Sequence, residues 1–376
     1  MTLTSSAAAD ATASRLQRAQ AAMAAAGVDA LLVGAGADLR YLTGYHALPL
    51  ERLTLLVARA DGRHTLVVPQ LEEPRAAAAL RSDAVELVAF GETADPFGLV
   101  AARLRDLGSA PVLAVGDVLW AAFLLRLQQV LPTASWRLAS EVTRDLRMRK
   151  DAAELAALRR AAQAIDRVHA AIPELLRPGR SEAEVGRDIA DRIVAEGHDA
   201  ADFVIVASGP NAASPHHETG ERVIAAGDVV VVDIGGPLDG YFSDCTRTYV
   251  VGSPPDGFRD AHDALLAAQQ AAVAAVRPGV TAASVDAAAR DLLTEAGYGD
   301  AFIHRTGHGI GLEVHEHPYI VAGNDLVLEP GMTFSIEPGV YLPGRFGLRI
   351  EDIVAVTPDG CERLNTRDRA AVVVSP

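Results

Sequence analysis

The chain has 376 residues, an apolar content of 49% and a formal net charge of −15 at pH 7. This length predicts about two globular domains at roughly 150 residues each, and the apolar fraction suffices for a core in both. The acidic balance argues against nucleic acids and anionic membranes as partners, because phosphate groups are bound by clustered lysine and arginine.

The predicted first domain, residues 1–145, reads as an α/β domain in which helices and strands alternate. A helix over 13–26 ends at Gly27 and precedes a strand over 28–34 and a turn-rich connection over 37–46. The apolar runs on either side of Asp61-Gly62 predict a β-hairpin. Helices are then expected at 71–81, 96–107 and 118–130, and strands at 84–90 and 111–116.

The predicted second domain, residues 146–376, reads as α+β. A charged helical segment over 140–162 leads into it, and helices are expected at about 151–176, 181–196, 257–276 and 281–296. Strands are expected at 203–209, 228–236, 241–252, 333–340 and 348–357. This mixture suggests helix pairs packed on one face of an antiparallel sheet. No tandem repeat is apparent.

Targeting and redox signals are weak along the whole sequence. The first 26 residues lack a basic start followed by an apolar core, and no run of about 18 apolar residues predicts a membrane helix. Cys245 and Cys361 form no C-x-x-C pair, so neither a redox pair nor a cysteine zinc site is expected. We therefore expect a cytoplasmic protein. Lys150 is the only lysine, which we interpret as compositional bias.

A histidine-rich stretch, FIHRTGHGIGLEVHEH over 302–317, is the densest chemical signal in the chain. It holds four of the eleven histidines, and three glycines separate them: His304, His308, His315 and His317 with Gly307, Gly309 and Gly311. Glycine lets backbone segments pack closely. Histidines fixed on such backbone are candidates for metal binding or proton transfer, whereas a solvated loop is the alternative.

Four carboxylates interrupt apolar runs elsewhere in the second domain. Asp233 ends a valine-rich strand and Asp244 lies in the next one; turn or capping roles are the alternatives. Glu337 is expected in mid-strand, and Glu351 lies two residues after Arg349, on the same side of another strand. Buried carboxylates need a cation. One histidine with four carboxylates suits two divalent ions such as Mn²⁺, Co²⁺ or Zn²⁺, which together can activate a water.

In this order and within these motifs, Asp233, Asp244, His308, Glu337 and Glu351 resemble the five ligands of the pita-bread metallopeptidases. This is the family of aminopeptidase P, prolidase and methionine aminopeptidase. The resemblance covers the whole chain, including the motifs YLTGY, HRTGHGIGLEVHE and EPGVYLPGRFGLRIED. It implies a pita-bread catalytic domain from about residue 150, preceded by the amino-terminal domain of the creatinase, prolidase and aminopeptidase P branch.

The same resemblance implies a role for each ligand. Asp233 would chelate one metal, Asp244 and Glu351 would bridge both, and His308 and Glu337 would complete the other. Glu337 would also carry the proton from the bridging water to the leaving nitrogen, which is general acid–base work.

Four further residues match substrate-side positions of the family. His315 would stabilise the tetrahedral intermediate and His216 would contact the substrate backbone, with the neighbouring His217 as the alternative. His304 and Arg349 would position substrate or ligands. His317 is expected to line the rim of the pocket without a catalytic task, and the remaining histidines are expected to be structural: His46, His64, His169, His198 and His262.

The implied function is a two-metal peptidase that hydrolyses the Xaa-Pro bond, preferentially of dipeptides, by attack of a metal-bridging water. Creatinase-like members lack the metal ligands, and methionine aminopeptidases usually lack the first domain. The alternatives are an aminopeptidase P acting on longer peptides and a non-catalytic binding protein on the same scaffold. Manganese is the expected metal, and a homodimer is expected.

The chain departs from the pattern of many prolidases at the position that would bind the substrate carboxylate. Many prolidases carry an arginine between the last motif histidine and the EPG strand, but here that loop, HPYIVAGNDLVLEPG, has none. A dipeptidase must bind the free carboxylate, most strongly through a bidentate arginine. Arg345, Arg40 and Arg52 are the candidates, with ordinary surface positions as the alternative for each.

Overall fold

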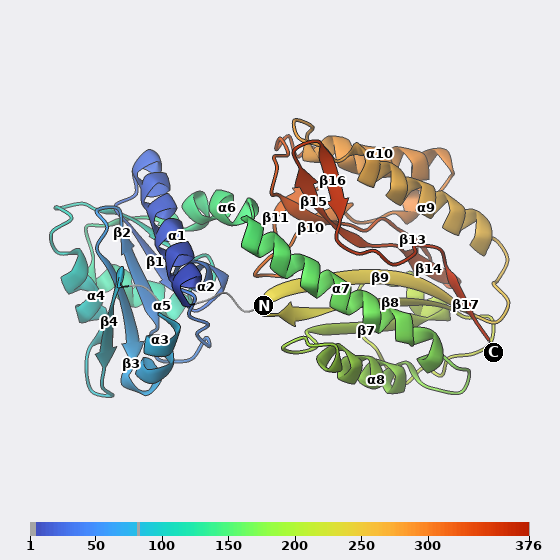
Figure 1. The fold of residues 1–376 in the computed structure, drawn as a ribbon, viewed down its shortest axis with the longest axis horizontal. Helices are drawn as coiled ribbons and strands as arrows, with labels where there is room; N and C mark the ends of the chain where they lie inside the picture. The colour runs from blue at the N-terminus through green and yellow to red at the C-terminus, as the bar shows by residue number, and fades with distance from the viewer. Residues whose placement is uncertain (1–4, 81–82, 376) are drawn as a thin grey trace. The chain divides into compact units, whose positions relative to one another are not determined.

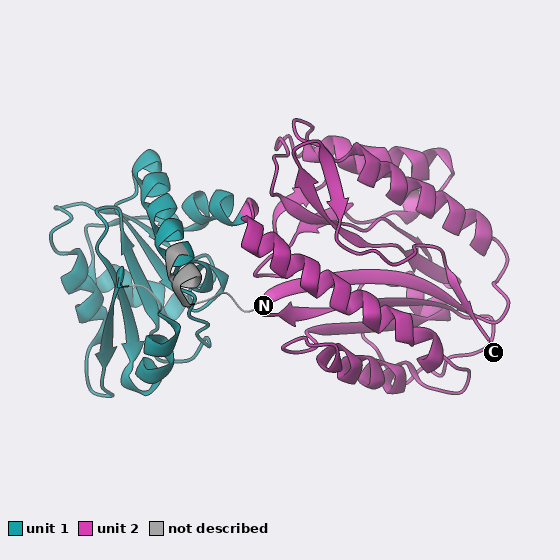
Figure 2. Ribbon diagram, viewed as in Figure 1, with its two compact units in different colours: residues 1–147 teal, residues 148–376 magenta. Residues whose placement is uncertain are grey.

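The computed structural model describes residues 5–80 and 83–375, with side chains from residue 11 onward. The chain divides into two compact units, one up to Arg147 and one from Met148 (Figure 2). Each unit has its own apolar core, around Leu32 and Val57 in the first and around Val232 and Phe334 in the second. Over the described ranges, no helix is both long and apolar enough to cross a bilayer.

The first unit is an α/β domain built on a six-stranded sheet with the strand order β4-β3-β2-β1-β5-β6 (Figure 1). The β1–β2 and β2–β3 pairs are antiparallel, and the other pairs are parallel. Its elements are α1 (Ser5–Ala26), β1 (Ala30–Gly34), α2 (Ala37–Thr43), β2 (Leu55–Arg59), β3 (His64–Pro69), α3 (Glu73–Ala79), β4 (Val85–Phe90), α4 (Pro96–Leu104), β5 (Val112–Val115), α5 (Ala121–Val130), β6 (Ser135–Leu138) and α6 (Ser140–Met148).

The hairpin predicted around Asp61-Gly62 is confirmed as β2 and β3, but two other predictions in this unit are wrong. The segment expected to be a turn-rich connection contains α2, which ends at Gly44 with a φ of 77°. Glycine commonly ends helices in this left-handed conformation. The edge strand β6 was not predicted, because its four residues are too few for a clear alternation of apolar side chains.

The second unit is α+β. Its elements are α7 (Ala152–Leu175), α8 (Glu182–Ala195), β7 (Phe203–Ser208), β8 (Val229–Leu238), β9 (Tyr241–Val251), α9 (Phe258–Ala275), α10 (Ala282–Glu295), β10 (Gly307–Gly309), β11 (Glu316–Ile320), β12 (Thr333–Ile336), β13 (Gly339–Leu342), β14 (Phe346–Arg349), β15 (Asp352–Thr357), β16 (Gly360–Arg363) and β17 (Val372–Val374). The strands form sheets in the orders β17-β9-β8-β7 and β11-β10-β12-β15-β16, with β13-β14 as a separate ribbon.

Each helix pair of the second unit packs on its own sheet, where the sequence suggested a single helix-covered sheet. Ile189 of α8 packs in one core with Val232 of β8. Leu265 of α9 packs in another with Phe334 of β12. Figure 1 shows α7 and α8 beside the β7–β9 strands and α9 and α10 beside the later strands.

The second unit also contains a structural repeat, although its sequence shows no tandem repeat. Arg-Pro-Gly precedes α8 at 177–179 and α10 at 277–279. In both copies the glycine N–H bonds to a later carbonyl, from Gly179 to Ile224 and from Gly279 to Leu328. Nine residues after each of these partners stands an acidic residue, Asp233 or Glu337. Each copy of the repeat therefore places a candidate metal ligand at the equivalent position.

The charged segment 140–162 is not one helix, because α6 ends at Met148 and α7 begins at Ala152. The Asp151 side chain accepts hydrogen bonds from the start of α7, and the Glu154 carboxylate accepts the Asp151 N–H at 2.9 Å. Such a capping box marks a helix start. Between the helices, the Lys150 N–H donates to the Gly331 carbonyl at 2.9 Å.

Candidate active site

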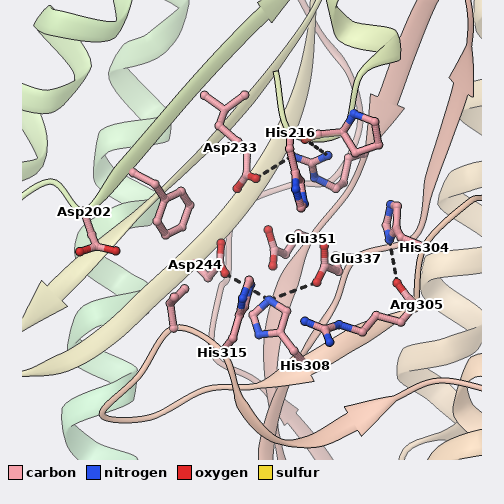
Figure 3. Close-up of a pocket in the computed structure, with 15 residues that line it drawn as sticks. Asp202, His216, Asp233, Asp244, His304, Arg305, His308, His315, Glu337 and Glu351 are labelled. Carbon is pink, nitrogen blue, oxygen red and sulfur yellow. Dashed lines mark hydrogen bonds and ion pairs between the residues drawn. The ribbon is translucent and has the colours of Figure 1, made fainter. Parts of the chain in front are cut away.

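One cavity of about 560 Å³ in the second unit gathers titratable side chains from segments far apart in the chain (Figure 3). All nine residues predicted for the site line it, although their roles stay predictions. The lining residues are Asp202, Phe203, Ile205, Pro215, His216, Asp233, Asp244, His304, Arg305, His308, Val314, His315, Glu337, Arg349 and Glu351.

Asp233 and Asp244 enter the cavity from neighbouring antiparallel strands. In the β8–β9 ladder Asp233 faces Thr246, and Asp244 faces Gly235. Because side chains two residues apart on a strand point the same way, both carboxylates leave the same face of the hairpin. The prediction that adjacent strands bring these two residues to one pocket is confirmed in its geometry.

Glu337 and Glu351 lie at breaks between strands, so the prediction of mid-strand positions is wrong. β12 ends just before Glu337, and Pro338, which has no N–H for a ladder, follows it. The backbone N–H of Glu337 bonds to Thr306 at 2.8 Å, and that of Glu351 bonds to Thr246 at 3.1 Å. At each glutamate the chain leaves one sheet for another, which turns the carboxylate into the cavity.

His308 lies between two of these carboxylates (Figure 3). Its Nδ1 is 3.1 Å from the Gly309 carbonyl, so Nδ1 carries hydrogen and Nε2 faces the carboxylates as the candidate ligand atom. Nε2 is 3.5 Å from Asp244 and 3.2 Å from Glu337. A Cβ at Gly307 would lie 1.8 Å from the Ser335 carbonyl oxygen. The glycines of the motif therefore let adjacent strands close around the imidazole.

The donor set fits a divalent cation. Ligand atoms of Asp244, His308 and Glu351 all lie within 4.8 Å of one another, and the three residues are buried. Oδ1 of Asp233 and Oε1 of Glu351 are buried without a hydrogen-bond partner in the described structure. Buried polar atoms are rarely left unpaired, because their desolvation is then uncompensated. Carboxylate oxygens and an imidazole are ligands that Mn²⁺, Co²⁺ and Zn²⁺ accept.

The crowding of the carboxylates also favours a bound cation. Burial, followed by the neighbouring charge of Glu351, raises the pKa of Asp244. Burial, followed by the charge of Glu337, raises the pKa of Glu351. Burial also acts to raise the pKa of Glu337, but the hydrogen bond and charge offered by His308 outweigh it and lower that pKa to about 2. Crowded carboxylates repel one another, and a divalent cation relieves this repulsion.

Arg349 contacts two of the candidate ligands, one directly and one through Thr246. Its guanidinium donates to Asp233 Oδ2 at 2.6 Å and to Thr246 Oγ1 at 3.1 Å. Thr246 in turn donates to Glu351 Oε2 at 2.8 Å. One arginine thus orients two candidate ligands, and such outer hydrogen bonds tune metal sites.

Tyr341 is a residue of this network that the sequence did not predict. Nδ1 of His304 faces the Arg305 carbonyl at 2.7 Å, so its Nε2 accepts the Tyr341 hydroxyl at 2.8 Å. The same hydroxyl accepts from Arg349 at 2.8 Å. Burial raises the pKa of Tyr341 to about 12, so the phenol stays protonated. Its place within the EPGVYLPG motif is the signal that could have indicated it.

His216 and His217 point to different surroundings. His216 lines the cavity, whereas His217 Nε2 lies 2.8 Å from Oε2 of the fully buried Glu182. Ser208 and Asn211 also donate to Glu182. The location favours His216 as the histidine that would contact substrate. His217 instead helps Glu182 to hold the loop that follows Ser208.

His315 stacks edge-on against His308, with ring centroids 4.0 Å apart and planes at 71°. Burial, helped by the positive charges of His308 and Arg305, lowers the pKa of His315 to about 4. The ring is therefore neutral near pH 7 and offers one N–H as a donor. His317, expected at the rim of the pocket, does not line the cavity, and its ring is tilted against that of Tyr319, with centroids 4.7 Å apart and planes at 56°.

An unpredicted arginine, Arg305, faces the cavity. Its guanidinium lies 4.4 Å from the centre of the Tyr319 ring, and no carboxylate of the described residues forms an ion pair with it. Arg345 is exposed and donates to the Asp256 carbonyl at 2.7 Å, and Arg52, in the first unit, pairs with Glu92 at 3.0 Å. Arg40 also lies in the first unit.

Two family models match the chain. The one described as Metallopeptidase family M24 covers residues 156–358, and the one described as Creatinase/Prolidase N-terminal domain covers residues 15–149. The matches are separated by residues 150–155 and together span most of the chain.

Individual relatives agree with these models. A Mycobacterium tuberculosis protein named "Probable dipeptidase PepE" is 53% identical over 369 residues, which cover 96% of both chains. The Xaa-Pro dipeptidase of Lactobacillus delbrueckii subsp. lactis is 37% identical over 341 residues, covering 89% of this chain and 92% of that one. The crystal structure of dipeptidase PepE from Mycobacterium ulcerans has a TM-score of 0.91 at 52% identity, covering 98% of this chain and 99% of its own.

Proposed function

The chain belongs to metallopeptidase family M24, with a creatinase-type first domain and a pita-bread catalytic domain, and we propose that it hydrolyses Xaa-Pro dipeptides with two divalent metal ions. The observation that carries the proposal is the set of five candidate ligands around one cavity, two of which have buried oxygens without a partner. The dipeptidase names of the relatives supply the substrate class. Manganese is the proposed ion, with cobalt and zinc as alternatives.

The bound ions would activate a water and polarise the scissile carbonyl. The chain itself would handle protons and orientation. Glu337 would take the proton of the attacking water and return it to the leaving nitrogen. His315, neutral near pH 7 because its pKa is about 4, would donate a hydrogen bond to the oxygen that becomes negative. His216 would bind the peptide backbone, and His304 and Arg349 would orient the groups around it.

The preference for dipeptides would come from Arg305. A dipeptide places its free carboxylate one residue beyond the scissile bond, so a cationic group inside the cavity is required. Arg305 lines the cavity and rests on Tyr319, whereas Arg345 bonds to the backbone outside it. A planar guanidinium binds a carboxylate with two parallel hydrogen bonds.

Steady-state kinetics of the metal-reloaded protein test the proposal. After chelation, the protein is given Mn²⁺, Co²⁺ or Zn²⁺ and assayed with an Xaa-Pro dipeptide and the matching Xaa-Pro-Xaa tripeptide. A higher kcat/KM for the dipeptide supports a dipeptidase, and the reverse order would identify an aminopeptidase P. A protein that binds no stoichiometric metal and hydrolyses neither peptide would be a binding scaffold.

The expected homodimer is part of the proposal. Exposed apolar side chains gather on the first unit, where Leu48, Leu50 and Trp120 border a shared surface hollow. Such patches commonly mark association surfaces. Light scattering coupled to size exclusion would distinguish a dimer from a monomer of 39.4 kDa.

A further inference from the structure

A buried ion pair lies next to the cavity without belonging to it. Lys150 Nζ and Glu316 Oε1 are 2.6 Å apart, and the two side chains are 1% and 7% exposed. Lys150 is the single lysine among 34 lysine and arginine residues. A compositional bias toward arginine explains the other cations but not the one position that keeps a lysine. Burying a charged pair is costly unless its geometry is good, so this position needs a reason.

Glu316 stands where the His315 loop returns to the sheet. It begins β11 and faces Gly309 of β10 across the ladder. The loop between them, residues 310–315, carries Val314 and His315 into the cavity. Glu316 follows His315 directly in the chain, so the place of its carboxylate fixes the point from which His315 projects.

The space around the Lys150–Glu316 ion pair is narrow, which favours lysine over arginine. A Cβ at Gly311 would lie 3.0 Å from Lys150 Cε and 2.6 Å from Glu316 Oε1. The ammonium is a compact charge, whereas the guanidinium of arginine is a broad planar group. The backbone of Lys150 is itself anchored to Gly331 at 2.9 Å. A fixed, compact charge therefore sits beneath the loop.

We propose that Lys150 and Glu316 are positioning residues that hold the 310–315 loop so that His315 meets the reacting carbonyl. The inference rests on the proposed function for its effect on turnover. The pair acts through His315, so it contributes to kcat more than to KM. A displacement of about 1 Å in such a group costs on the order of a hundredfold in rate.

A double-mutant cycle tests this coupling in the metal-loaded full chain. Lys150→Met, His315→Ala and the double variant are assayed with an Xaa-Pro dipeptide, and metal content is measured for each. We expect Lys150→Met to lower kcat by roughly ten- to a hundredfold with metal content unchanged. In the His315→Ala background the same substitution should have no further effect. Full activity of Lys150→Met, or an equal loss in both backgrounds, would overturn the proposal.

Arg149→Met is the matched control. Arg149 neighbours Lys150 and pairs with Glu329 at 2.7 Å, but this pair is 38% and 48% exposed and does not include a residue of the 310–315 loop. Its removal should leave kcat unchanged. If Lys150→Met does not fold, Glu316→Gln takes its place in the double-mutant cycle, because it keeps the side-chain shape and removes the charge.

Hydrogen exchange gives a readout that does not depend on the activity. Peptides spanning residues 310–316 should exchange faster in Lys150→Met and Glu316→Gln than in the wild type or Arg149→Met. Unchanged exchange in both variants would also overturn the proposal. If the wild type hydrolyses no Xaa-Pro peptide, the proposed function fails. Hydrogen exchange still tests whether the Lys150–Glu316 pair holds the 310–315 loop.

Discussion

Arg349 donates a 2.6 Å hydrogen bond to one carboxylate oxygen of Asp233, while the other oxygen, Oδ1, is buried without a hydrogen-bond partner in the described structure. The arginine thereby directs the free oxygen toward the remaining ligands. Arg349→Met should raise the metal dissociation constant by about 10- to 100-fold, the usual effect of removing a group that orients a ligand. Isothermal titration of the chelated protein with Mn²⁺ measures it.

The control for this variant is Arg160→Met. Arg160 pairs with Asp239 at 3.2 Å on the surface, so its loss should leave the metal affinity unchanged. An Arg349→Met protein that binds Mn²⁺ as tightly as the wild type would show that the hydrogen bond to Asp233 does not tune the site.

Asp244 should be essential for metal retention. It belongs to the closest group of candidate ligands, with His308 and Glu351, and is 4% exposed. Asp244→Ala removes both carboxylate oxygens, so we expect loss of stoichiometric metal and of Xaa-Pro turnover. Elemental analysis after dialysis and a dipeptide assay measure the two effects. A fully active variant would contradict the ligand assignment.

Much of the second unit is predictable from its sequence, because each of the four candidate carboxylate ligands interrupts an apolar run. Asp233 and Asp244 lie on paired strands as expected. Glu337 and Glu351 reach the same cavity from strand breaks, where the Glu337 N–H bonds to the Thr306 carbonyl outside the strands and the Glu351 N–H bonds to Thr246 of β9. Periodicity predicts that an apolar segment is extended, but it does not show where the chain changes partners.

Other features depend on contacts that no local pattern contains. Lys150 meets Glu316 across 166 positions of the chain, and Arg349 reaches the Pro215 carbonyl across 134. Such pairs form only when the whole unit packs. The break before α7 is different, because the Asp151 and Glu154 spacing of its capping box is a readable local signal.

Arg305 should determine the preference for a free carboxylate. Arg305→Met removes the guanidinium that faces the cavity, so kcat/KM for an Xaa-Pro dipeptide should fall by roughly 10- to 200-fold, or about 1.5–3 kcal/mol for a hydrogen bond to a charged group. The amidated dipeptide, which has no carboxylate, should lose much less. The comparison of the two substrates isolates the carboxylate.

Arg345→Met controls for the loss of positive charge. Arg345 is exposed and bonds to the Asp256 carbonyl, so its removal should not change the ratio between dipeptide and amide. A ratio that changes in Arg345→Met and stays constant in Arg305→Met would transfer the role to Arg345.

The final prediction concerns His169, which ties α7 to β9 behind the ligands. It is fully buried, and its Nε2 faces the Cys245 carbonyl at 3.0 Å while Nδ1 meets the Tyr249 hydroxyl at 2.9 Å. Nε2 therefore carries the hydrogen and the ring is neutral. Burial, followed by the charge of Arg247, lowers the pKa of His169 to about 3, against about 6.5 in an unfolded chain.

Between pH 6.5 and pH 3 the unfolded chain therefore binds a proton that the folded chain does not, so stability falls as the pH drops. The slope for one proton is about 1.4 kcal/mol per pH unit, or about 2 kcal/mol between pH 7 and pH 5. His169→Gln should lose this part of the pH dependence, and the exposed His46→Gln should keep it.

Both tryptophans, Trp120 and Trp136, lie in the first unit, so their fluorescence does not report on the second. Unfolding in urea is better followed by pulsed alkylation of the buried Cys245, on chelated protein to remove metal effects. Equal pH dependence in wild type and His169→Gln would mean that His169 is protonated in the folded chain.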